Sequence, residues 1–191
     1  MRGLDMDDAQ RKALLAFARA VIRSRLTGGA APPAPKPAPE PGRCSGAFVT
    51  LHKYGELRGC IGCFADNVSA VDTVREMAVA ALGDTRFLHK PVTAAELDEL
   101  DIEISVLSPM ERTADPLSLE PGAHGILIRR GGCSGCFLPQ VATEQQWTKE
   151  QFLSYCCSHK AGLPADAWKD SDTEVFLFTA EVFGEEELGG G

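Results

Sequence analysis

The residues best suited to chemistry lie in the segment Leu57–Gly62, which reads LRGCIG. On an extended strand alternate side chains point to the same face, so Arg58 and Cys60 share a face with Cα atoms roughly 6–7 Å apart. A guanidinium at that distance favours the thiolate, the nucleophilic form of cysteine. Gly59 and Gly62 remove side chains near the sulfur and allow a ligand or another backbone to come close. The pattern indicates a reactive or ligand-binding Cys60, and the alternative is a buried cysteine on a strand that bends at its glycines.

A histidine supplies a further candidate group. His124 lies in the segment PGAHG, residues 121–125, just before an apolar run that is typical of a strand. An imidazole in that place can act as a general base or as the partner of a thiolate. The alternative is a loop histidine with ordinary hydrogen bonds. We therefore name Cys60 as the candidate nucleophile, Arg58 as the group that stabilises the thiolate or an anionic substrate, and His124 as the group that moves protons.

An acidic and a basic residue follow a glycine that is expected to end a helix. Asp84 and Arg86 come directly after Gly83, and glycine is a common helix terminator. The two charges form either a local salt bridge or part of a ligand pocket, and the sequence favours the bridge.

The seven cysteines include two C-x-x-C pairs, Cys60/Cys63 and Cys133/Cys136. Four thiolates of this kind can bind zinc, although compact zinc ribbons separate their pairs by only about 15–20 residues. On an extended strand the two cysteines of a pair point to opposite faces, so a metal site requires a sharp turn inside each pair. We assign no metal and no cofactor, and we keep a zinc-stabilised domain as an alternative.

The elements that position these residues follow from apolar periodicity and from capping residues. We expect helices over residues 6–26, 68–82 and 148–160, a hairpin over 46–64, strands over 101–107, 125–130 and 173–183, and a helical turn after the capping pair Thr93 and Glu96. This irregular order predicts an α+β fold with a mostly antiparallel sheet flanked by helices, rather than repeated βαβ units.

Prolines divide the chain. Residues 27–42 contain six of the 12 prolines and therefore form neither a helix nor a central strand. We expect residues 1–26 to form a helix packed on the domain, 27–43 a proline-rich linker, 44–184 the domain itself, and 185–191 a disordered tail.

Composition excludes several classes of function. Among the 191 residues, 27 acidic against 19 basic side chains give a net charge of −8, which argues against stand-alone binding to nucleic acid. No apolar run approaches the roughly 18–20 residues of a membrane span. The acidic N-terminal residues are unlike a secretory signal, and the odd number of cysteines suits a reducing compartment. We expect a cytoplasmic protein that does not bind membranes.

The chain resembles the AMMECR domain family, whose prokaryotic members are called AmmeMemoRadiSam system protein A. The resemblance rests on LRGCIG and on further segments in the same order: Asp84–Phe87, Leu100–Pro109, Gly122–Ile126, Phe137–Trp147 and Phe152–Trp168. It implies an α+β fold with two unequal subdomains around a cleft. It also carries the arginine, cysteine and histidine of the family onto Arg58, Cys60 and His124.

The resemblance implies partners but no established reaction. By its name, the system joins this domain with a Memo-like protein and a radical S-adenosylmethionine (SAM) enzyme. Cys63 and the Cys133/Cys136 pair depart from the family pattern. A non-catalytic adaptor or scaffold that docks both partners is the alternative function, so the sequence leaves open whether the domain is an enzyme and what its substrate is.

Overall fold

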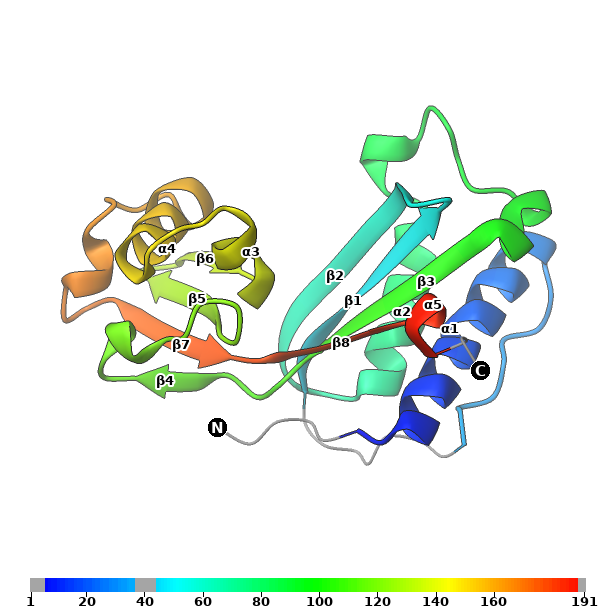
Figure 1. Ribbon diagram of the computed structural model, residues 1–191, viewed down its shortest axis with the longest axis horizontal. Helices are drawn as coiled ribbons and strands as arrows, with labels where there is room; N and C mark the ends of the chain where they lie inside the picture. The colour runs from blue at the N-terminus through cyan, green and yellow to red at the C-terminus, as the bar shows by residue number, and fades with distance from the viewer. Residues whose placement is uncertain (1–5, 37–43, 189–191) are drawn as a thin grey trace. The chain divides into compact units, whose positions relative to one another are not determined.

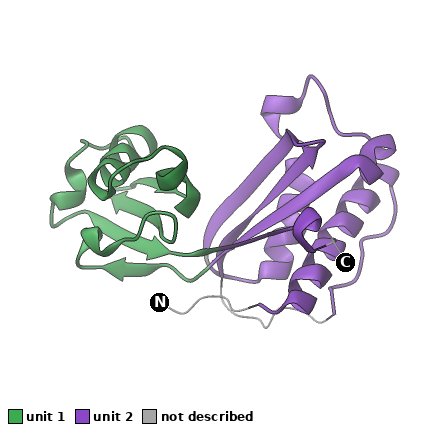
Figure 2. Cartoon of the chain, viewed as in Figure 1, with its two compact units in different colours: residues 1–3, 108–180 green, residues 4–107, 181–191 purple. Residues whose placement is uncertain are grey.

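The structure, a computed structural model, describes residues 6–36 and 44–188 and divides into two compact units (Figures 1 and 2). Among the described residues, the larger unit takes 6–36, 44–107 and 181–188, and the smaller unit takes 108–180. The side chain of Asp66 lies outside the described part. Each unit has its own sheet and its own apolar core.

The larger unit is built on a four-stranded sheet with the order β2-β1-β3-β8. Its strands are β1 (Cys44–Lys53), β2 (Glu56–Val68), β3 (Leu100–Leu107) and β8 (Ala180–Gly184). Strand β1 pairs antiparallel with both β2 and β3. The expected hairpin is confirmed, and Tyr54 and Gly55 both have positive φ at its tip, the conformation that a tight two-residue hairpin turn requires. Strand β2 lies at one edge of the sheet.

Two helices cover one face of this sheet (Figure 1). They are α1 (Asp8–Thr27) and α2 (Ala70–Ala81). Every second side chain of β1 and β3 faces these helices and is fully buried: Ala47, Val49, Leu51, Ile102, Ile104 and Val106. Because strand side chains alternate, the residues between them, Thr50 and Glu103 among others, belong to the opposite face.

The smaller unit has a second four-stranded antiparallel sheet with the order β4-β7-β5-β6. Its strands are β4 (Glu111–Thr113), β5 (Gly125–Arg130), β6 (Cys133–Phe137) and β7 (Glu174–Phe178). Its helices are α3 (Pro139–Glu144) and α4 (Lys149–Tyr155), and α4 continues as a π-helical turn over Cys156–Ala161. The fold class is confirmed: the protein is α+β, with antiparallel sheets flanked by helices.

The structure departs from expectation in the C-terminal third. The single strand expected over residues 173–183 is two strands, β7 and β8, which belong to different sheets. Between them the Thr179 N–H donates to Ser108 Oγ, and the Ser108 N–H donates to the Thr179 carbonyl. These bonds occupy the backbone groups that a continuous ladder would use.

The expected disordered tail begins instead with a helical turn, α5 (Glu185–Leu188). The Glu185 carboxylate binds the Arg19 guanidinium and accepts a hydrogen bond from the Ile102 N–H, which ties this turn to α1 and β3. The last three residues of the expected tail, and residues 37–43 of the expected linker, lie outside the described residues. Within residues 6–36 and 44–188, no helix combines the length and the apolar character that crossing a bilayer requires.

Candidate functional site

Cys60 lies in the middle of edge strand β2, directly opposite Thr50 of β1. The preceding residue, Gly59, faces α2, and a Cβ atom built there would lie 2.3 Å from the Ala81 carbonyl oxygen. Only glycine allows this close approach of strand and helix. Because side chains alternate along a strand, Cys60 points to the opposite face, and it is half-buried there.

The backbone of Cys60 is held by two side chains from the segment that follows α2. Its N–H donates to Asp84 Oδ2 at 3.0 Å, and its carbonyl accepts from Arg86 Nη2 at 3.1 Å. Edge strands normally leave such groups to solvent or to another chain. Here the Asp84–Arg86 pair takes the place of a neighbouring strand and fixes the position of Cys60.

Asp84 and Arg86 form the local ion pair that the sequence favours. Asp84 accepts from Arg86 Nε at 3.0 Å and from Nη2 at 2.6 Å. These bonds hold the pKa of the Asp84 carboxyl well below its usual range. The pKa of Arg86 is raised, first by Asp84 and to a smaller degree by the neighbouring Cys60 thiol. The Asp84 side chain is only 2% exposed, whereas that of Arg86 is 57% exposed, so the pair presents its cation outward.

The sulfur of Cys60 has a hydrogen-bond donor on the next strand. Thr50 Oγ1 donates to Cys60 Sγ at 3.3 Å, and this bond restricts the position of the sulfur. On its other side Thr50 is opposite Glu103 of β3. Burial raises the pKa of the Glu103 carboxyl. A thiol, a hydroxyl and a carboxyl therefore stand in a row across three strands.

Arg58 lies on the same strand as Cys60, but its guanidinium is bound elsewhere. The side chain is only 3% exposed, with Nη1 donating to Glu96 Oε1 at 2.6 Å and Nη2 to the Lys90 carbonyl at 3.1 Å. Arg58 and, second, Lys53 hold the pKa of the Glu96 carboxyl well below its usual range. A buried guanidinium takes a carboxylate partner because an unpaired buried charge is costly. The cation in contact with Cys60 is consequently Arg86.

Arg86 and Thr50 are the site residues that the sequence alone did not assign to Cys60. The hairpin predicts that Thr50 lies near Cys60, but the two-residue turn at residues 54–55 alone would pair Thr50 with Gly59. A register shift between Leu51 and His52 leaves Arg58 unpaired and places Thr50 opposite Cys60. Arg86 carried no comparable signal, because its contact with the Cys60 carbonyl spans 26 positions of sequence.

His124 belongs to the smaller unit, whereas Arg58 and Cys60 belong to the larger one. Its Nδ1 accepts a hydrogen bond from the Glu120 N–H at 3.0 Å. In the neutral imidazole the proton is therefore on Nε2. The structure thus brings Arg58 and Cys60 together on one strand, and the role of His124 stays a prediction.

The two C-x-x-C pairs lie on continuous strands. Ile61 and Gly62 pair with Val49 and Phe48 of β1, and Cys133–Cys136 pairs in the same uninterrupted manner with β5. The sharp turn that a zinc knuckle needs is replaced by extended strand in both. No group of three or more His, Cys, Asp or Glu side chains within the described ranges is arranged to hold a metal ion. This geometry gives no support to the zinc-stabilised alternative.

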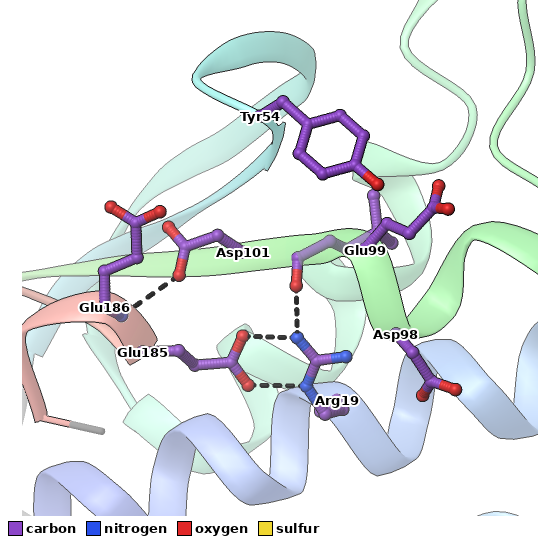
Figure 3. Close-up of a pocket in the computed structure, with 8 residues that line it drawn as sticks. Arg19, Tyr54, Asp98, Glu99, Asp101, Glu185 and Glu186 are labelled. Carbon is purple, nitrogen blue, oxygen red and sulfur yellow. Dashed lines mark hydrogen bonds and ion pairs between the residues drawn. The ribbon is translucent and has the colours of Figure 1, made fainter. Parts of the chain in front are cut away.

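An acidic hollow of about 580 Å³ opens elsewhere in the larger unit (Figure 3). Its charged and aromatic lining residues are Arg19, Tyr54, Asp98, Glu99, Asp101, Glu185 and Glu186. The Arg19 guanidinium is already bound by the Glu185 carboxylate and by the Leu100 carbonyl (Figure 3). Cys60 does not line this hollow, so the hollow is distinct from the thiol site.

The fold and the site define a class: a two-unit α+β protein with a half-buried thiol clamped at a sheet edge by an Asp–Arg pair. A family model described as AMMECR1 matches residues 15–183, and the chain belongs to this family. A protein of Methanothermobacter thermautotrophicus is 42% identical over 183 residues, which is 92% of this chain and 94% of that protein. A protein of Thermococcus gammatolerans is 41% identical over 186 residues, covering 91% of this chain and 89% of that one.

A solved structure shares the fold. The crystal structure of the uncharacterized protein PH0010 from Pyrococcus horikoshii aligns with a TM-score of 0.76 and 38% sequence identity, over 94% of this chain and 92% of that one.

Proposed function

We propose that Cys60 is the reacting group of this protein, and that the chain is the thiol-bearing component of a three-part system with a Memo-like protein and a radical SAM enzyme. The thiol role rests on one observation: a half-exposed sulfur on an edge strand whose backbone is clamped by Asp84 and Arg86. The partnership rests on the resemblance to the AmmeMemoRadiSam family.

The neighbours of Cys60 support nucleophilic chemistry. Thr50 holds the sulfur by a donated hydrogen bond, and the Asp84–Arg86 pair fixes the strand beneath it. Arg58 then acts as a positioning residue, since it ties β2 to Glu96 and to the Lys90 carbonyl. His124 is proposed to move protons through Nε2.

Selective alkylation tests the thiol role. We expect iodoacetamide to label Cys60 faster than Cys133, although Cys133 is the more exposed thiol, because Thr50 and the edge clamp hold the Cys60 sulfur in a fixed position for attack. Thr50→Val should slow labelling of Cys60 by about fivefold, equivalent to the loss of a hydrogen bond worth about 1 kcal/mol. The measurement is peptide mass spectrometry after timed labelling, with Cys133 as the internal control. Labelling of Cys60 no faster than Cys133 would count against a reactive role.

Reconstitution tests the partnership and separates it from the adaptor alternative. The purified chain should bind a Memo-like protein and a radical SAM enzyme from the same organism in a pull-down. Cys60→Ser should leave binding intact and abolish turnover of the reconstituted system, and His124→Asn should lower turnover while iodoacetamide labelling of Cys60 stays normal. Binding together with full turnover by Cys60→Ser would instead identify a non-catalytic adaptor.

A further inference from the structure

We propose that the substrate recognised at Cys60 is a small anion, whose carboxylate or phosphate group binds the outer edge of the Arg86 guanidinium while an adjacent electrophilic atom meets the Cys60 sulfur. This inference rests on the proposed thiol function and adds the chemical class of the substrate.

The guanidinium of Arg86 is fixed on its inner edge. Nε and Nη2 bind the Asp84 carboxylate, and Nη2 also binds the Cys60 carbonyl. The Phe87 ring lies against it, 5.5 Å from centroid to guanidinium carbon. Nη1 takes no part in these contacts, and more than half of the side chain is exposed. An arginine oriented in this way, with one edge free, is suited to bind anionic oxygens.

The bond from Arg86 to the Cys60 carbonyl sets the distance between cation and sulfur. The guanidinium binds the backbone carbonyl of Cys60, the same residue whose side chain is the thiol. A ligand whose anionic group reaches Arg86 therefore needs only a short spacer before its reactive atom arrives at Cys60. A neutral molecule forms no ion pair with Arg86 in this arrangement.

The local charge differs from that of the whole chain. The protein carries a net charge of −8, yet the loop after α2 exposes Arg86, His89 and Lys90. Its one carboxylate, Asp84, is buried beneath Arg86. The carboxylate of nearby Glu96 forms ion pairs with Arg58 and Lys53, which offset its negative charge. A basic loop on an acidic protein raises the concentration of small anions beside it.

The reaction needs no oxidant or cofactor. The Cys60 thiolate donates an electron pair to the electrophilic carbon, a sulfur–carbon bond forms, and the leaving group departs with the electron pair of the bond that breaks. The thiol proton passes to solvent water. Thr50 keeps the sulfur in place throughout.

Two alkylating reagents that differ in charge test this inference. Iodoacetate and iodoacetamide share the reacting carbon and the iodide leaving group, but only iodoacetate carries a carboxylate. We take the ratio of the iodoacetate rate constant to the iodoacetamide rate constant at each cysteine. The intrinsic reactivity of the sulfur affects both rate constants and therefore cancels in this ratio. We expect this ratio to be at least fivefold higher at Cys60 than at Cys133 in the same protein. Arg86→Gln should reduce the ratio at Cys60 to that at Cys133, and Arg86→Lys should retain most of the preference.

Arg23→Gln is the matched control, because Arg23 is also 57% exposed but lies on α1, on the opposite face of the sheet. It should leave the ratio unchanged. Inorganic phosphate and acetate, compared at constant ionic strength, should slow alkylation by iodoacetate, and the stronger competitor identifies the preferred group. Three results would overturn the inference. The ratio of rate constants at Cys60 could equal that at Cys133, it could stay unchanged in Arg86→Gln, or neither anion could compete with iodoacetate. Slow labelling of Cys60 by both reagents overturns the thiol function itself.

Discussion

Glu96→Ala is expected to lower the free energy of unfolding by about 3–5 kcal/mol, the cost of leaving a buried charge without its partner. Arg58 is almost completely buried, and its Nη1 depends on Glu96 Oε1. The same carboxylate binds Lys53 through Oε1 and the Thr93 N–H through Oε2. Urea denaturation, followed by circular dichroism, measures the change.

Glu99→Ala provides the matched control for this substitution. Glu99 lies in the same 3₁₀ helix, Ala94–Glu99, and also pairs with Lys53. It is exposed, however, and exposed ion pairs contribute about 0–1 kcal/mol. Equal losses for the two variants would contradict the assignment of Arg58 to Glu96.

The dependence of stability on pH provides an independent readout of the same pair. Arg58 lowers the pKa of Glu96 in the folded state, so the unfolded state binds a proton more readily. The stability that the pair contributes is therefore complete above the unfolded pKa of about 4.3 and is lost as the pH falls toward the lower folded value. The wild type should lose stability more steeply than Glu96→Ala as the pH falls below about 5, while Asp84 contributes the same slope to both proteins. Parallel curves would show that Glu96 gains nothing from Arg58.

Gly59→Ala should produce the second large effect. A Cβ atom at this position would lie 2.3 Å from the Ala81 carbonyl oxygen. Backbone atoms cannot rotate out of the way, so strand β2 and helix α2 must separate. Overpacking of this kind costs about 1–3 kcal/mol, and more where the backbone must move. The separation should also loosen the bond from the Cys60 N–H to Asp84, so iodoacetamide labelling of Cys60 should change together with stability.

Gly83→Ala is the control for this effect. Its added methyl group would meet the Ala80 carbonyl oxygen at 3.5 Å, an ordinary van der Waals contact, and we expect a change within about 0.5 kcal/mol. If Gly59→Ala were as mild as Gly83→Ala, the close packing of β2 on α2 would not be a constraint on the site.

Local patterns in the sequence determined most of the elements. Apolar periodicity predicted α1 and α2, and the capping pair Thr93 and Glu96 predicted the 3₁₀ helix that supplies the carboxylate for Arg58. These features depend on residues within a few positions of one another, so a single sequence contains their causes.

Only the tertiary structure decided which groups meet. It broke the final strand at Thr179, because Ser108 competes there for the backbone hydrogen bonds. In the folded chain Arg58 binds the Glu96 carboxylate, and Arg86 binds the Cys60 carbonyl. These contacts span 38 and 26 positions of sequence. A long, flexible arginine side chain can reach many partners, and its choice depends on which carboxylate or carbonyl the folded backbone brings within hydrogen-bond distance. Spacing along the chain does not contain that information.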